Sequence, residues 1–149
     1  MINYLYCFDS KYNIQALCSM YSLLEQSSEK LNIDIIHNNP ASFESIYNKI
    51  IEHPFLNNLK IHQFNNPGVT FPNIEGTHIS EATYYRIFID QYLSLKNEYY
   101  VYIDADIICH RDPTLNFTSE IKELKKSGFI ISVKTEHLRK KDTEEMFER

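Results

Sequence analysis

Two carboxylates separated by one residue, Asp104 and Asp106, follow a run of aromatic and β-branched residues at 99–103. Such a run predicts a strand that is covered on both faces, as in a parallel sheet. Along an extended chain, residues i and i+2 point the same way, with Cα atoms about 6–7 Å apart. Two carboxylates at that spacing can bind one divalent cation, or one can bind the metal while the other holds a ligand hydroxyl. The alternative interpretation is a solvated acidic turn, because Asp-x-Asp is common by chance.

The composition bounds the class of protein. The chain has 149 residues, with 15 Lys and Arg against 20 Asp and Glu, which gives a net charge of −5. This length suits one domain, and the negative charge predicts no broad basic surface and no nucleic-acid partner. The spacing of Cys7, Cys18 and Cys109 matches neither a disulfide framework nor a metal-binding pattern. Cys7 and Cys18 have apolar neighbours, so we expect buried thiols.

The sequence also bears on location. The short apolar run at the N-terminus has no basic region before it, and Asp9 interrupts it, so we expect no signal peptide. No stretch approaches the roughly 20 apolar residues of a membrane span. Together with the unpaired cysteines, these features predict a cytoplasmic protein.

The first half of the chain alternates between strand and helix patterns. Strands are predicted at 2–8, 33–37 and 59–64, and helices at 13–27 and from a cap at Ser42 to Pro54. The expected buried stripes are Ile14, Leu17, Cys18, Tyr21 and Leu24 in the first helix, and Phe43, Ile46, Tyr47, Ile50 and Ile51 in the second. This order predicts a parallel sheet with helices on its faces, which binds ligands at the carboxyl ends of its strands. We expect strands 2–8 and 99–104 to lie side by side and to bring Asp9 and Asp104 to one cleft.

The second half is predicted to hold a long loop, two helices and two strands. The loop covers 65–77, and a helix covers 80–95 with the buried stripe Ala82, Tyr85, Ile89, Tyr92 and Leu93. After the strand at 99–103, Ser119 is expected to cap a short basic helix that ends at Gly128, and 129–133 is expected to form a strand. Residues 135–149 are charged and helix-prone but lack a cap. We therefore expect the chain to be the N-terminal part of a longer protein.

Three separated segments carry a resemblance to a known family. They are LYCFDSKY at 5–12, HISEATYYRIF at 78–88 and YVYIDADII at 100–108. Their order and spacing resemble the family 8 retaining glycosyltransferases, which include glycogenin and bacterial lipopolysaccharide galactosyl- and glucosyltransferases. The middle segment followed by an Asp-x-Asp is more specific than either piece alone. The resemblance covers roughly residues 2–135.

The resemblance implies both a fold and an activity. The fold is GT-A, an α/β Rossmann-like mixed and mostly parallel sheet flanked by helices, here a single nucleotide-sugar-binding donor domain over 1–149. The activity is that of a retaining hexosyltransferase that uses UDP-glucose or UDP-galactose, a saccharide acceptor and a divalent metal, Mn²⁺ or Mg²⁺. An acceptor such as the lipopolysaccharide core implies peripheral contact of the full-length protein with the inner membrane face.

The resemblance also implies roles for individual residues. The catalytic set is Arg86, Asp104 and Asp106, the metal ligands are Asp104 and Asp106, and the nucleotide-binding set is Phe8, Asp9, Tyr12, Arg86, Ile103, Asp104, Ala105 and Asp106. Tyr12 would stack on the uracil, Asp9 would accept its N–H, and the guanidinium of Arg86 would suit paired oxygens. The alternatives are a packing role for Tyr12, a salt bridge for Arg86 and a turn position for His78.

Some of the family's pattern has no match in this sequence. The family's third metal ligand is a histidine near a glycine and a lysine, and neither His110 nor His137 stands in that pattern. We therefore expect the chain alone to transfer sugar poorly. Two other functions stay open: a truncated or degenerate nucleotide-binding domain without turnover, and a phosphohydrolase with Asp104 as nucleophile and Asp106 as acid/base. Ile108 speaks against the phosphohydrolase, because that chemistry expects Thr or Val at its position.

Overall fold

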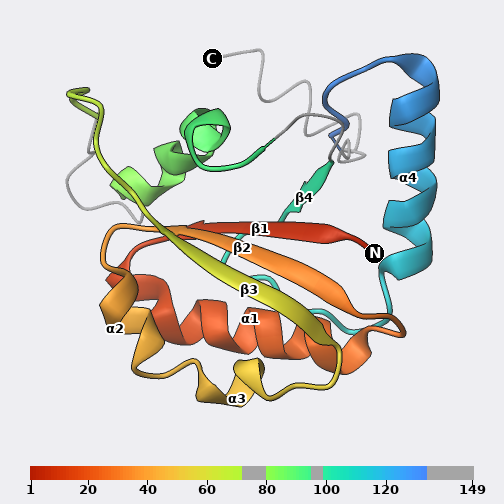
Figure 1. The fold of residues 1–149 in the computed structure, drawn as a ribbon, viewed down its shortest axis with the longest axis horizontal. Helices are drawn as coiled ribbons and strands as arrows, with labels where there is room; N and C mark the ends of the chain where they lie inside the picture. Colours follow the sequence, from red (N-terminus) through yellow and green to blue (C-terminus); the bar gives the residue numbers. More distant parts are fainter. Residues whose placement is uncertain (72–79, 95–98, 134–149) are drawn as a thin grey trace, which may run out of the picture. The chain divides into compact units, whose positions relative to one another are not determined.

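The computed structural model describes residues 1–71, 80–94 and 99–133 (Figure 1). The first compact unit, Met1–Ser119, contains the whole sheet, and the second is Glu120–Arg149. In chain order the elements are β1 (Asn3–Phe8), the 3₁₀ turn η1 (Ser10–Tyr12), α1 (Asn13–Gln26), β2 (Leu31–His37), α2 (Pro40–Glu44), α3 (Asn48–Ile51), β3 (Leu56–Gln63), the 3₁₀ helix η2 (Glu81–Gln91), β4 (Tyr100–Tyr102) and α4 (Thr114–Ser127). Among these described residues, no helix is long and apolar enough to cross a membrane.

The four strands form one parallel sheet in the order β3-β2-β1-β4. Phe8 pairs with His37 on one side of β1, and Leu5 pairs with Tyr102 on the other. The predicted α/β class and the predicted neighbourhood of the first strand and the Asp-x-Asp strand are both confirmed. Among the strands of the described residues, β4 is an outer one and its residues are half-buried, so the expectation of a strand covered on both faces is wrong.

The helices α1, α2 and α3 lie on one side of the sheet, as Figure 1 shows. The buried residues of α1 are Asn13, Ala16, Ser19, Met20, Leu23 and Leu24. The predicted stripe is therefore wrong apart from Leu24 and the partly buried Leu17, because Ile14, Cys18 and Tyr21 are exposed. The buried face is set by the sheet: the small residue Ser19 faces the large buried side chain of Tyr6, while Met20, Leu23 and Leu24 fill the rest of this face. The Tyr6 hydroxyl bonds the hydroxyl of Ser19 at 3.3 Å.

The predicted second helix is divided into α2 and α3. Ser42 lies inside α2 and does not cap it, because the helix already begins at Pro40. The hydroxyl of Ser45 donates to the carbonyl oxygen of Ser42 at 2.9 Å, a bond that competes with helix continuation. Phe43 and Ile50 are buried as predicted, whereas Ile51 is exposed.

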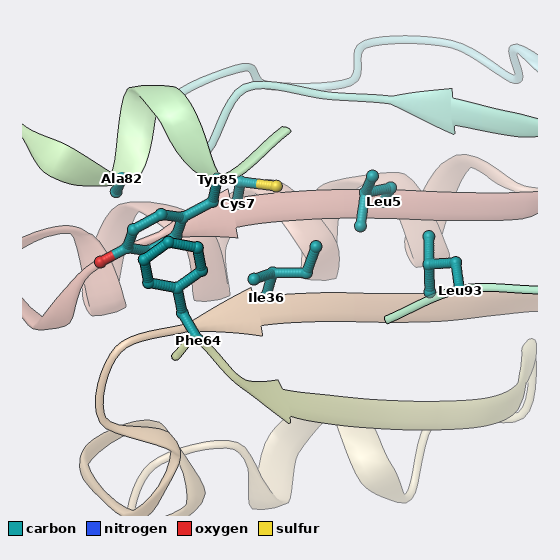
Figure 2. Packing of buried hydrophobic residues seen from close by; sticks show 7 residues of the cluster. All are labelled: Leu5, Cys7, Ile36, Phe64, Ala82, Tyr85 and Leu93. Carbon is teal, nitrogen blue, oxygen red and sulfur yellow. The ribbon is translucent and has the colours of Figure 1, made fainter. Parts of the chain in front are cut away.

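The opposite face of the sheet carries the cluster drawn in Figure 2, made of Leu5, Cys7, Ile36, Phe64, Ala82, Tyr85 and Leu93. The ring of Tyr85 stacks on Phe64 with centroids 3.8 Å apart. The predicted stripe of η2 is confirmed, since Ala82, Tyr85 and Leu93 are buried and Ile89 and Tyr92 pack against them. The helix type is not as expected: it is 3₁₀, with non-helical angles at Phe88. Its many aromatic and β-branched residues, which lose rotamer freedom in an α-helix, account for this.

Two expectations about the region after β4 are wrong. The helix α4 begins at Thr114, before Ser119, because the carboxylate of Asp112 accepts the Thr114 N–H at 2.9 Å. Residues 129–133 form no strand and are exposed. Gly128 does end the helix, with φ +74° and its N–H bonded to the carbonyl of Leu124 at 3.0 Å. The expectations for 72–77, Leu95 and 135–149 lie outside the described residues.

Candidate functional site

The Asp-x-Asp motif lies at the carboxyl end of β4, beside the carboxyl end of β1. The N–H of Ile103 donates to the carbonyl of Leu5 at 3.0 Å, which continues the pairing up to the motif. The N–H of Ile107 then donates to the carbonyl of Asp104 at 3.2 Å, so the motif itself is a turn. The extended spacing assumed for the two carboxylates is therefore wrong. Asp104 and Asp106 are both exposed, while Ala105 between them is buried.

Asp104 has a neutral hydrogen-bond donor beside it. The hydroxyl of Tyr102 donates to Oδ1 of Asp104 at 2.7 Å. Burial, and then this bond, raise the pKa of Tyr102, so the phenol stays protonated and acts as a donor. Sequence reasoning did not identify Tyr102, although the period of two in a strand could have paired it with Asp104. The bond orients one carboxylate oxygen of the motif.

Arg86 lies next to the same carboxylate. Its Nη1 is 4.0 Å from Oδ1 of Asp104, and its Cζ lies 4.8 Å from the ring centroid of Tyr102. Its Nε donates to the carbonyl of Thr83 at 3.0 Å. The side chain is still 43% exposed, so the guanidinium can reach an anion outside the protein. The position of Arg86 is therefore compatible both with a salt bridge to Asp104 and with the predicted binding of an anion.

The segment after β1 forms a tight turn. Oδ1 of Asp9 accepts the N–H of Lys11 at 2.9 Å, and the Asp9 carbonyl accepts the N–H of Tyr12 at the same distance. Asp9 is buried, and Tyr12 is half-buried. The side chain of Phe8 is core, packed edge-on against His37 and Phe43 with centroids 4.9 and 5.2 Å away. Only the backbone of Phe8 is therefore suited to contact a ligand.

A buried polar network behind this turn was not anticipated. His37 Nε2 lies 2.9 Å from Oδ1 of Asn13, and the amide nitrogen of Asn13 donates to the hydroxyl of Ser42 at 3.1 Å. The N–H of Asn39 donates to Nδ1 of His37 at 2.8 Å. A histidine at the predicted end of the second strand was the available signal, since such positions adjoin ligand sites in parallel sheets. The network joins the loops that follow β1 and β2.

The carboxylates were predicted to hold a divalent metal. Among the described residues, no group of three or more His, Cys, Asp or Glu side chains could enclose such an ion. Two exposed carboxylates are nevertheless oxygen ligands of the kind that Mg²⁺ and Mn²⁺ prefer, and such ions often complete their shell with substrate phosphates and water. Asp104 and Asp106 therefore fit a metal shared with a ligand. His78 and His137 lie outside the described residues.

Cys7 is buried behind the motif. Burial raises the pKa of its thiol to about 12, with Arg86 lowering it and Asp104 raising it by lesser amounts. Because the thiol stays protonated, it is unsuited to act as a nucleophile. Arg86 and Asp104 thus lie near enough to the end of β1 to act on the charge of this thiol.

A separate groove of about 340 Å³ is lined by Tyr21, Glu25, Lys49, Glu52, His53, Pro54 and Phe55. It lies at the amino ends of β2 and β3, because the Phe55 carbonyl accepts the N–H of Leu31. Ligands of parallel sheets bind at the carboxyl ends, where the predicted residues are found. The groove is therefore not part of the candidate site.

Comparison with known proteins identifies one family. The family described as "Glycosyl transferase family 8" matches residues 3–143 of the chain. A search of curated proteins finds no match. The parallel sheet with helices on its faces is GT-A-like, in agreement with that family.

Proposed function

Because the chain belongs to glycosyl transferase family 8, it is a glycosyltransferase, and we propose that it transfers a hexose from UDP-glucose or UDP-galactose to a saccharide acceptor. We further propose that transfer needs a divalent metal and retains the anomeric configuration. The observation that carries the proposal is the position of Arg86 beside Asp104, at a strand end next to the Asp9 turn. This arrangement offers a cation, two carboxylates and a half-buried aromatic ring at adjacent strand ends. The family match also favours this reaction over phosphohydrolysis.

The diphosphate of the donor would be held by Arg86 together with a metal on Asp104 and Asp106. A guanidinium presents several N–H donors in one plane, which suits the paired oxygens of a diphosphate. The metal, when bound, supplies Lewis acidity that neutralises charge on the departing nucleoside diphosphate. Tyr102 holds Oδ1 of Asp104 by a 2.7 Å bond, so the carboxylate is oriented before the donor arrives.

The base of the donor would be recognised at the turn after β1. Tyr12 is half-buried, which leaves part of its ring for stacking on uracil. The carboxylate of Asp9 already accepts the N–H of Lys11 with Oδ1, and it retains lone pairs for the uracil N–H. Replacing Tyr12 by Ala should weaken uridine binding, while Phe should preserve it.

Calorimetry of UDP binding, with and without Mn²⁺, tests the donor site. Mn²⁺ should strengthen UDP binding to the wild type by about tenfold or more, because metal and diphosphate complete each other's coordination. Asp104→Asn and Asp106→Asn should remove that metal effect. Asp90→Asn is the matched control, since Asp90 is exposed on η2. UDP binding that does not respond to Mn²⁺ in the wild type would refute the metal assignment.

The reaction itself is tested by incubating the protein with UDP-glucose or UDP-galactose and a panel of saccharide acceptors that includes lipopolysaccharide core. The proton NMR coupling of the new glycosidic linkage reports the anomeric configuration. Products with the donor's α configuration support retention. Products with the β configuration would instead assign an inverting reaction.

A further inference from the structure

The buried network at the ends of β1 and β2 forms a closed ring of hydrogen bonds. Nδ1 of His37 accepts the N–H of Asn39, so that nitrogen carries no proton, and the proton on Nε2 must be donated to Oδ1 of Asn13. The amide of Asn13 then donates to the Ser42 hydroxyl, which donates to the Asn39 carbonyl at 2.7 Å. The ring thus returns to Asn39 and defines one tautomer of His37.

The ring of bonds connects directly to the turn that carries the expected base contacts. Asn13 is the first residue of α1 and directly follows Tyr12. The hydroxyl of Ser10, inside the turn, lies 3.0 Å from the hydroxyl of Ser42. Ser42 has already given its proton to the Asn39 carbonyl, so Ser10 is the donor in this pair. Ser10 within the turn and Asn13 directly after it both therefore contact Ser42 of α2.

His37 is completely buried, and its neighbours come from β1, α1, α2 and the residue after β3. The ring contacts Phe8 of β1 and lies 6.5 Å from the stacked ring of Phe43 in α2. Its carbonyl accepts the N–H of Phe64, just after β3, at 2.8 Å. Burial lowers the pKa of His37, and Asp9, the charged group that faces it, opposes this effect. A neutral imidazole is what the tautomer above requires.

We propose that His37 is a positioning residue for donor binding, which acts through Asn13 and Ser42 to hold the Asp9–Tyr12 turn in its base-binding conformation. The proposal rests on the donor site proposed above. The need for an imidazole here follows from its two nitrogens, one accepting and one donating. A phenylalanine would fill the same apolar space between Phe8 and Phe43 but would leave Asn13 and Asn39 without these partners.

The direct test is amide hydrogen exchange of the turn in His37→Phe, in the absence of any ligand. The N–H groups of Lys11 and Tyr12, both bonded to Asp9, should exchange about tenfold faster than in the wild type. His62→Phe is the matched control, because His62 is also a strand histidine with one polar partner, Asp34 at 2.8 Å. It should destabilise the fold without changing the turn.

Ser42→Ala gives the same test in a milder form, in case His37→Phe does not fold. Ser42 is only half-buried, yet its hydroxyl joins Ser10, Asn13 and Asn39. The variant should also speed exchange at Lys11 and Tyr12. If both residues keep wild-type exchange in a folded variant of either kind, the network does not hold the turn and the proposal is overturned.

Uridine binding tests whether the turn contributes to recognition of the base. Uridine is used because it has no phosphate whose titration would affect the pH dependence. Wild-type affinity should hold from about pH 7.5 to the ordinary imidazole pKa of about 6.5 and fall only at lower pH, because burial lowers the pKa of His37 in the folded protein and Nδ1 stops accepting from Asn39 only once it is protonated. His37→Phe should bind uridine about tenfold more weakly at the higher pH and lose this dependence. A folded His37→Phe with wild-type affinity and pH profile would overturn the positioning role. A wild type that binds neither uridine nor UDP would instead refute the proposed donor site, whatever the exchange data show.

Discussion

Nη1 of Arg86 lies 4.0 Å from Oδ1 of Asp104, which brings together two motifs that are separate in the chain. The contact is not an isolated surface ion pair, because the guanidinium also lies over the ring of Tyr102, whose hydroxyl bonds the same carboxylate oxygen. A planar cation is thus held beside the acid before any ligand binds. Its orientation, rather than its charge alone, is what the site offers to a diphosphate.

Arg86→Ala and Arg86→Lys should therefore differ from each other in UDP binding. The alanine variant should bind UDP about tenfold or more weakly, because a charge-assisted hydrogen bond is lost. The lysine variant should recover only part of the loss, since an ammonium lacks the planar fork and stacks poorly on Tyr102. Calorimetry in the presence of Mn²⁺ measures both.

Arg111→Ala is the control for the loss of an exposed positive charge. Thermal unfolding of all three variants should stay near that of the wild type, because changes at exposed positions alter stability by about 0.5 kcal/mol or less. Full recovery of UDP affinity by lysine would show that charge alone matters at this position.

The strands, and the placement of Asp9 and Asp104 just after two neighbouring ones, could be predicted from the sequence because their signals are local. The aromatic and β-branched runs predict β1 and β4, and parallel pairing then places Asp9 and Asp104 at neighbouring strand ends. The buried face of α1 was not predictable in this way. Ser19 and Ala16 are buried because of what the sheet presents to them, Tyr6 above all, and that is a tertiary contact with no local signature.

The residues that the sequence did not reveal are those that hold other site residues in place, not those expected to contact a ligand. Tyr102 has the pattern of one more apolar strand residue, and the bond of its hydroxyl to Asp104 appears only in the structure. His37 and Asn13 are 24 positions apart and meet only after β1 and β2 have paired. Sequence patterns identify residues that contact a ligand more readily than residues that hold others in place, because the latter depend on the assembled fold.

The three cysteines should react with iodoacetamide at very different rates. Burial raises the pKa of Cys7 to about 12 and also shields its sulfur, whereas Cys18 is exposed and Cys109 is intermediate. At pH about 8, Cys18 should be alkylated first and Cys7 only when the protein opens. Mass spectrometry of peptides from a time course measures the order. Modification of Cys7 at the rate of Cys18 would contradict the buried position of β1.

Removing the hydroxyl from two buried tyrosines should have opposite consequences for stability. The hydroxyl of Tyr6 bonds Ser19, and Tyr6→Phe should lower the free energy of unfolding by about 1 kcal/mol, since Ser19 is left buried without that partner. The hydroxyl of Tyr85 has no hydrogen-bond partner among the described residues, so Tyr85→Phe should be neutral or stabilising. Urea unfolding compares them. An equal loss in both variants would show that Tyr85 does have a partner.

The free energy of unfolding should depend on pH through His37. Burial lowers the pKa of His37 in the folded protein, while in the unfolded chain it takes its ordinary value of about 6.5. Above about pH 6.5, His37 is neutral in both the folded and the unfolded protein, and its full contribution to the free energy of unfolding is present. As the pH falls below that value, the unfolded chain binds the proton first, so the free energy of unfolding decreases until the pH passes the lower, folded pKa.

The slope from this one residue cannot exceed about 1.4 kcal/mol per pH unit. His37→Phe should lack this pH slope. The difference in free energy of unfolding between wild type and variant should therefore shrink as the pH falls from about 7 to 5. Urea unfolding across that range gives the difference directly, and the other histidines, common to both proteins, cancel in it. A difference that stays constant would mean that the pKa of His37 is the same in the folded and unfolded protein. A difference that grows toward acid pH would mean that folding favours the charged imidazole and that the tautomer assigned to His37 is incorrect.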